Sequence, residues 1–167
     1  MYTFDDAWLA KLDAMREKGE EPYPNGLTVT HTSTDLHARF VDVDDPETVE
    51  YGEVCVAGRL MFRNRMGKVL FLRIHDRGEP TVPGKDADGE DVMLGGRIQV
   101  FVQKNAVGDE AYERLKTLDI GDWVGARGTV MRTKTGELTV RALECQLASK
   151  ILTPFPDRFH GLHDIEL

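Results

Sequence analysis

The residues with the clearest capacity for chemistry lie in two strand-like runs, residues 69–74 and 97–103. Apolar side chains occupy every second position of both runs, and alternate side chains of a strand point to opposite faces. The alternation therefore leaves Phe71 in the first run, and Gln99 and Phe101 in the second, on the outer face of a sheet. An exposed aromatic ring beside an amide can stack on an unpaired base and hydrogen-bond to its edge. These residues predict a surface that reads single-stranded nucleic acid.

Each of these residues also has a purely structural explanation. Phe71 could be an apolar side chain that the segment 78–96 or an N-terminal helix covers, and Gln99 by itself could be a solvated strand residue. The amide of a glutamine can, however, pair with both the acceptor and the donor groups on the edge of uracil. The neighbouring Phe71 therefore favours base recognition by Gln99.

Basic residues surround the predicted surface in the sequence. They are candidates for contacts with RNA phosphates, although any one of them could equally be a solubilising surface charge. The candidates are Arg63, Arg65, Lys68, Arg73 and Lys134.

The elements that would position these residues form a small barrel. Alternating apolar residues predict strands at 53–65, 68–76, 97–103, 122–132 and 137–147, and a helix at 109–118 between the third and the fourth strand. This order is that of an OB-fold, a mainly β, five-stranded Greek-key barrel whose sheet face binds oligonucleotides. Gly58, Gly125 and Gly128 suit the bends of a small barrel, although strand glycines also mark simple bulges. Hairpin turns are predicted at 64–67 and 133–136.

The chain divides into an N-terminal helical extension at 1–52, the barrel at 53–149 and a tail at 150–167. The extension contains an amphipathic helix at 5–18, with Asp5 as its N-cap and Gly19 as its stop, and a short helix at 34–40 capped by Thr34. Residues 78–96 are rich in Gly, Pro and acidic residues, and we expect them to form a long exposed loop inserted in the barrel.

The charge distribution narrows the class of protein. A formal net charge of -8 argues against a general nucleic-acid coat, because non-specific affinity comes from neutralised phosphates. Residues 53–78 nevertheless carry six Lys/Arg against two Asp/Glu, whereas residues 79–96 carry one against five. No apolar run approaches the length of about eighteen residues that a membrane helix needs, and the N-terminus is acidic. We therefore expect a cytoplasmic chain with no membrane partner.

Catalytic and metal chemistry are not apparent in the sequence. Cys55 and Cys145 lie within strand-like runs and read as reduced core residues. The acidic residues at 86–91 lack the register of an EF-hand, and His160 and His163 are a poor basis for a metal site. Neither a P-loop nor a GxSxG motif is present. We predict no catalytic residue, no metal and no cofactor for these residues.

Several longer runs resemble one family. They are "VAGRLMFRNRMGK" at 56–68, "FLRIHD" at 71–76, "IQVFV" at 98–102, "LDIGDWVGARGTVMRTKTGELTV" at 118–140 and "SKILTPFPDRFHGLHDIE" at 149–166. In this order they are similar to the N-terminal anticodon-binding domain of class II bacterial lysyl-tRNA synthetases, and the resemblance covers nearly the whole chain. It implies that residues 150–167 are a linker toward a catalytic domain that these residues do not include. Segment 78–96 is longer than the turn expected there.

The resemblance implies roles for individual residues. Phe71 would stack on an anticodon base, and Gln99 would hydrogen-bond to the central uridine of a UUU or CUU anticodon. Arg63 would contact a base or a phosphate, and Glu137 would hydrogen-bond to a neighbouring anticodon base. The family often has a basic residue where Asn64 stands, which removes one expected phosphate contact.

The leading hypothesis is thus a module that binds the anticodon stem-loop of lysine tRNA as part of a lysine-tRNA ligase. The resemblance implies ATP and Mg for the full-length enzyme only, and a homodimer for that enzyme, whereas we expect the isolated chain to be a monomer. Whether the chain belongs to an enzyme depends on a catalytic domain outside these residues. Two alternatives stay open: a stand-alone OB-fold protein that binds single strands generally, and a protein-interaction module. The latter would use apolar residues of the first helix, namely Trp8, Leu9, Leu12 and Met15.

Overall fold

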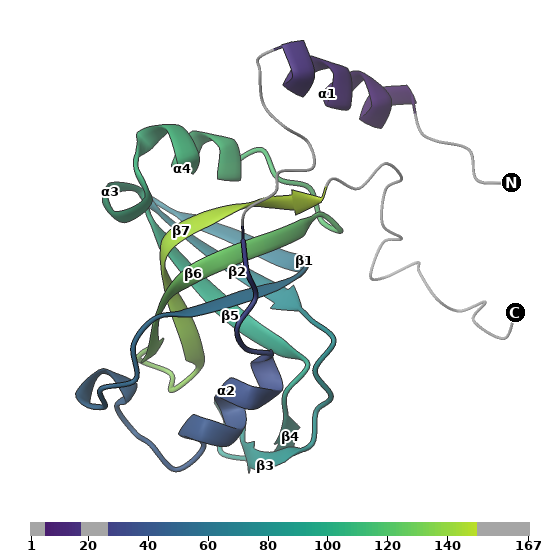
Figure 1. The fold of residues 1–167 in the computed structure, drawn as a ribbon. Helices are drawn as coiled ribbons and strands as arrows, with labels where there is room; N and C mark the ends of the chain where they lie inside the picture. The colour runs from purple at the N-terminus through teal and green to yellow at the C-terminus, as the bar shows by residue number, and fades with distance from the viewer. Residues whose placement is uncertain (1–5, 18–26, 150–167) are drawn as a thin grey trace, which may run out of the picture.

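The computed structural model describes residues 6–17 and 27–149. Five strands form a closed barrel in the order β1-β2-β5-β7-β6 (Figure 1). All neighbouring pairs are antiparallel except β5 and β7, which run parallel and close the barrel. The strands are β1 (Val54–Met66), β2 (Val69–His75), β5 (Arg97–Gln103), β6 (Trp123–Arg132) and β7 (Leu138–Ser149). The predicted five-stranded OB-fold architecture is confirmed.

Alternation within the strands builds the interior of the barrel. In β2, Leu70, Leu72 and Ile74 are at most 1% exposed, and in β5 Ile98, Val100 and Val102 are at most 2% exposed. The intervening side chains of both strands lie on the outside and are only partly covered. The periodicity of the sequence therefore assigned the two faces of β2 and β5 correctly.

Helices close the two ends of the barrel (Figure 1). Between β5 and β6, Tyr112 and Leu115 of the second of two short helices are each 2% exposed within the core. At the other end, Leu36 and Phe40 are fully buried. The helices at the first end are α3 (Lys104–Val107) and α4 (Asp109–Leu115), and the helix at the second end is α2 (Ser33–Phe40).

The start of α2 differs from the sequence prediction. The N-cap is Thr32 and not Thr34, because the Thr32 hydroxyl accepts a bond of 3.1 Å from Asp35 N–H and the Asp35 carboxylate accepts one of 2.9 Å from Thr32 N–H. This reciprocal capping box fixes the first turn. The Thr34 hydroxyl instead donates to the Glu79 carbonyl at 2.7 Å. The helix is therefore tied to the segment that follows β2.

The remaining N-terminal elements are short. Helix α1 (Asp6–Glu17) agrees with the predicted first helix, whose proposed cap Asp5 and stop Gly19 lie outside the described residues. Its Lys11 donates to the Thr117 carbonyl and pairs with Asp119, each at 2.6 Å. A 3-10 turn, η1 (Pro46–Thr48), leads toward β1. No helix among the described residues is long and apolar enough to cross a membrane.

The acidic insertion is not the long loop that the sequence predicted. Residues Val82–Lys85 (β3) and Asp91–Leu94 (β4) pair as an antiparallel hairpin that lies beside α2 (Figure 1). Val82 is only 9% exposed, so the hairpin has an inner side. The prediction was wrong because Pro83 and Gly84 interrupt the strand signal in a segment dominated by acidic residues.

The two predicted barrel hairpins have different outcomes. The turn at 133–136 is confirmed: Thr133 N–H donates to the Glu137 carbonyl at 3.1 Å, and Gly136 supplies a φ of 86°. The other turn is later than predicted, since β1 continues to Met66, which pairs with Val69. The connection there consists of Gly67 and Lys68.

Candidate nucleic-acid interface

The strand register places the outward side chains of four strands in rows across the sheet. Residues that pair across strands point to the same face, so each row is a continuous strip of surface. The first row consists of Asn64, Phe71, Phe101 and Arg141, and the second consists of Phe62, Arg73, Gln99 and Thr139. Thr139 is fully covered, and we call the other seven residues, which are exposed or half-buried, the reading face.

The first row carries a pair of aromatic rings. The centroids of Phe71 and Phe101 are 5.2 Å apart and the ring planes are tilted by 60°. Both side chains are half-buried, and they come from β2 and β5, which pair directly. The pair is a partly exposed apolar platform on which an unpaired base can stack.

Phe62 extends this platform through an irregularity in β1. The register shifts between Leu60 and Phe62, so Met61 is an extra residue that moves the following side chains to the opposite face. Phe62 is consequently 37% exposed on the outside, where the guanidinium of Arg73 lies 5.7 Å from its ring centroid. The sequence did not predict the bulge, and so it did not place Phe62 and Asn64 on the outer face.

The second row positions a hydrogen-bonding amide. Gln99 pairs with Thr139 across the parallel strands, and the Thr139 hydroxyl lies 3.0 Å from Gln99 Oε1 and 3.0 Å from the Glu137 carbonyl. Thr139 itself is fully buried. When the hydroxyl donates to Oε1, the Gln99 amide is turned so that its NH₂ group remains available to an acceptor on a base. The hydroxyl has one proton for these two acceptors, so this orientation of the amide holds when the proton points to Gln99 and not to the Glu137 carbonyl.

Glu137 reaches the same row from the turn before β7. Its Oε1 accepts a hydrogen bond of 3.0 Å from Arg73, and both side chains are about one-third exposed. The pair places a carboxylate acceptor and a cation side by side at the edge of the reading face. Such a pair can contact a base edge and a phosphate of one strand.

Arg63 and Arg65 do not join the reading face. The bulge pairs Arg63 with Leu72 and Arg65 with Leu70, the inward residues of β2. The guanidinium of Arg63 donates to the carbonyls of Leu118 and Lys116, the latter at 3.1 Å, and Arg65 donates to the Gly67 carbonyl at 3.3 Å. Both arginines therefore bond to backbone carbonyls at the end of the barrel near α4.

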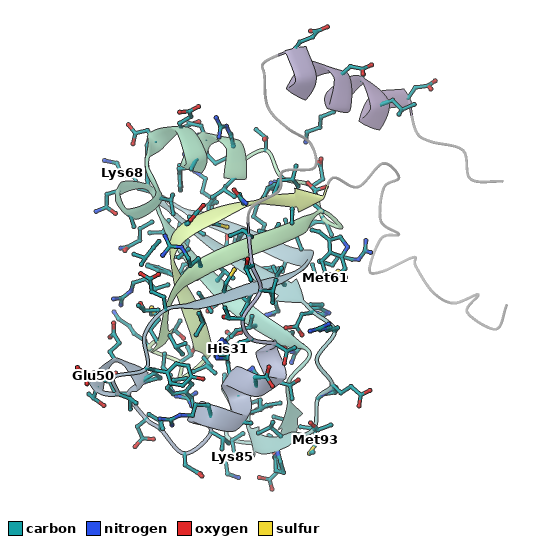
Figure 2. All side chains as sticks on the ribbon, in the orientation of Figure 1. His31, Glu50, Met61, Lys68, Lys85 and Met93 are labelled. Atoms are coloured by element: carbon teal, nitrogen blue, oxygen red, sulfur yellow. The ribbon has the colours of Figure 1, made fainter. Side chains whose placement is uncertain are left out.

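The two lysine candidates lie at opposite margins. Lys68 follows β1 near α3 and α4, at the end of the molecule opposite Lys85 of the hairpin (Figure 2). Lys134 is exposed in the β6–β7 turn, three residues before Glu137. Within the described ranges neither lysine side chain takes part in an ion pair.

The β6–β7 turn is held by a half-buried arginine that sequence reasoning did not single out. Arg132 donates to the carbonyls of Phe40, Val43 and Gly136 at 2.5, 2.8 and 2.9 Å. Partial burial lowers the pKa of its guanidinium, although the group stays charged at neutral pH. These bonds fasten the turn that carries Lys134 and Glu137 to the end of α2.

The cysteines are as the sequence predicted. Cys55 and Cys145 are buried free thiols, and burial raises the pKa of Cys145 to about 12. Among the described residues, no group of His, Cys, Asp and Glu side chains is arranged to hold a metal ion.

Comparison with known proteins agrees with this geometry. Residues 90–148 match the family model described as an OB-fold nucleic acid binding domain. Lysine–tRNA ligase from Enterococcus faecalis is 40% identical over 157 residues, and the match covers 93% of this chain. The ligases from Psychromonas ingrahamii and Burkholderia multivorans are 41% and 42% identical over 95% and 94% of the chain. The chain spans only 28% of the length of each of these relatives. Over nearly its whole length the chain is therefore similar to one part of lysine–tRNA ligases.

Proposed function

We propose that this chain is a tRNA-binding module that recognises the anticodon of lysine tRNA, as the N-terminal part of a lysine–tRNA ligase. The observation that carries the proposal is the pairing of Phe71 with Phe101 one row away from Gln99, on a barrel whose relatives are lysine–tRNA ligases. Charging of the tRNA with lysine, with ATP and Mg, would require a catalytic domain outside these residues. That function would take place in the cytoplasm.

Stacking supplies affinity in this proposal. The Phe71–Phe101 platform accepts the face of one anticodon base, and Phe62 accepts a second one beside it. Stacking of an unpaired base on an aromatic side chain is worth roughly 1–3 kcal/mol and tolerates any base. The platform by itself therefore does not select a sequence.

The polar groups supply selection. The NH₂ group of Gln99 donates to O4 of the central uridine, an atom that cytidine replaces with an amino group. Glu137 accepts from a neighbouring base, and Arg73 keeps its carboxylate in place. Arg73, Lys68 and Lys134 then meet phosphates. Asn64 and Arg141, which the register adds to the first row, are further candidates for sugar and phosphate contacts.

Arg63 has no base contact in this arrangement. Its guanidinium already donates to two carbonyls at the end of α4, on the inward side of β1. We assign to it the positioning of the β1–β2 hairpin against that helix.

The proposal is tested by fluorescence-anisotropy titration of the chain with a labelled lysine-tRNA anticodon stem-loop. A copy with the central uridine changed to cytidine tests selection, and Phe71→Ala tests stacking. We expect the base change to weaken binding, and Phe71→Ala to cost about 1–3 kcal/mol, which is about 5- to 150-fold. Ile120→Ala removes another exposed apolar side chain, before β6, and should leave binding unchanged.

The outcomes separate the candidate functions. Equal binding of the two stem-loops with a steep salt dependence would overturn the anticodon assignment in favour of a general single-strand binder. No binding at low salt would point instead to an interaction module.

A further inference from the structure

We propose that the cavity between the β3–β4 hairpin and the β6–β7 turn is a subsite for one additional base, that of a nucleotide flanking the anticodon on the bound RNA. This inference rests on the proposed function. The anticodon contacts proposed above do not involve the acidic insertion. This inference gives the insertion a role in RNA recognition.

The cavity has a volume of about 250 Å³. Its walls come from distant parts of the chain: Val92 and Leu94 of β4, Ile98 of β5, and Leu138 at the start of β7. Drug-sized ligands occupy pockets of about 300–1,000 Å³, so this cavity suits a smaller group such as one base. The apolar side chains from both sides give such a flat ring surfaces to lie against.

Continuity with the reading face identifies the occupant. Arg73 and Glu137, which form the ion pair at the edge of the reading face, also line the cavity. A strand that leaves the reading face past this pair enters the cavity directly. A flanking nucleotide of the same RNA is therefore present at high local concentration, whereas a free metabolite would have to arrive separately.

Charge complementarity supports a nucleotide. Arg97, Lys85 and Arg132 line the cavity besides Arg73. Lys85 pairs with Asp91 at 2.6 Å, and Arg132 is occupied by backbone carbonyls. The guanidinium of Arg97 forms no hydrogen bond or ion pair within residues 6–17 and 27–149. Arg97 is exposed, and it is the cation in this cavity that remains available to a phosphate.

His37 contributes a hydrogen-bonding group with a defined state. Its Nε2 donates to the Arg97 carbonyl at 3.2 Å, so Nε2 carries the proton in the neutral ring. Nδ1 is then an acceptor, and a base presents amino or imino donors to such an atom. This hydrogen bond also holds the backbone of Arg97 in place. The unpaired guanidinium of Arg97 therefore extends from a fixed point of the chain.

The test uses stem-loops in which the nucleotide just before or just after the anticodon is abasic. Wild-type chain should lose at least about fivefold in affinity for one of the two. Val92→Glu places a bulky carboxylate in the wall, and it should bind the intact stem-loop weakly and no longer respond to the abasic change. Thr81→Glu makes the same change of charge in the same segment, on an exposed residue outside the cavity, and should behave as wild type.

A second variant addresses the phosphate. Arg97→Gln should weaken binding and lower the salt dependence by about one phosphate contact, whereas Arg77→Gln, an exposed arginine outside the cavity, should not reduce affinity for the flanking nucleotide. Thermal unfolding of each variant shows whether the chain remains folded.

The results separate this inference from the proposed function. If the chain discriminates uridine from cytidine at the centre of the anticodon but neither abasic stem-loop binds more weakly, the subsite is overturned and anticodon recognition stands. If the abasic loss is the same in wild type and Val92→Glu, the flanking base lies elsewhere and the subsite is again overturned. If no stem-loop binds, both proposals fail.

Discussion

The hydroxyl of Thr139 lies 3.0 Å from Oε1 of Gln99, across the parallel pair of strands that closes the barrel. When its proton points to Gln99, this fully buried hydroxyl orients the amide proposed to distinguish uridine from cytidine. Thr139 would not itself touch RNA, and its effect would be on selectivity.

We expect Thr139→Val to reduce the discrimination between the uridine and cytidine stem-loops by about 2- to 10-fold, the worth of one neutral hydrogen bond. Valine keeps the shape of the side chain and removes the donor. Thr139→Ser restores the hydroxyl and should restore discrimination. A Thr139→Val chain that is folded and fully selective would show that Gln99 needs no such support.

A change in the ion pair between Arg73 and Glu137 should affect base recognition much more than the stability of the fold. Since both side chains are about one-third exposed, Glu137→Gln should change the free energy of unfolding by less than about 1 kcal/mol in urea titrations. The same variant should change the preference for one base beside the central uridine, which competition with loops altered at each position measures. Loss of affinity without any change of base preference would assign Glu137 to the positioning of Arg73.

Gly128 has no room for a side chain. A Cβ atom there would clash with the carbonyl of Arg141 in β7, at a shift of register between the paired strands. We expect Gly128→Ala to lower the free energy of unfolding by about 2 kcal/mol or more. Gly89→Ala is the control: Gly89 has a φ of 79° but nothing near it, so the cost should be about 1 kcal/mol. Equal losses would mean that β6 and β7 can separate locally.

The thiol of Cys145 should be inert in the folded chain. Burial raises its pKa to about 12, and burial also raises the pKa of Cys55, so in both residues the reactive thiolate is disfavoured relative to a free cysteine. Mass spectrometry after treatment with iodoacetamide should find both unmodified in the native protein and both alkylated in guanidinium chloride. Rapid native alkylation of Cys145 would require frequent opening of the barrel.

His37 makes stability depend on pH. Burial is the main cause that lowers its pKa below 6.5, and Arg132 adds to this, while the Arg97 carbonyl, Glu137 and Asp76 oppose it. The unfolded chain therefore binds a proton at a higher pH than the folded one, so stability is present above pH 6.5 and falls as the pH drops below it. His37→Gln should flatten this part of the curve of urea midpoint against pH. An unchanged slope would assign the dependence to other groups.

The sequence identified most of the barrel because strand faces follow a strict period of two. Phe71 and Gln99 lie in strands of regular register, and their outward positions were predicted correctly. No faces were assigned within β1, where the extra residue Met61 reverses them, so that Asn64 joins the reading face and Arg63, a contact implied by the resemblance, does not. A bulge depends on the pairing partner, and no local signal in the residues reveals it.

One of the other differences has a non-local cause and one a local cause. Hairpin β3–β4 packs against α2. Its acidic, glycine-rich sequence does not predict this contact. Thr32 and Thr34 are both good caps, and only the reciprocal bond with Asp35 selects the former. The roles of Phe71, Gln99, Glu137 and the lysines in RNA binding stay predictions.

The parallel pairing of β5 with β7 brings together residues 40 positions apart in the chain. Contacts of such high contact order form late in folding, since the intervening loop must close first. Truncated or nascent chains that end before β7 would hold Phe71, Gln99 and Glu137 but not Thr139. Such fragments would keep the Gln99 amide without the hydroxyl that contacts it, so full selectivity would require the completed barrel.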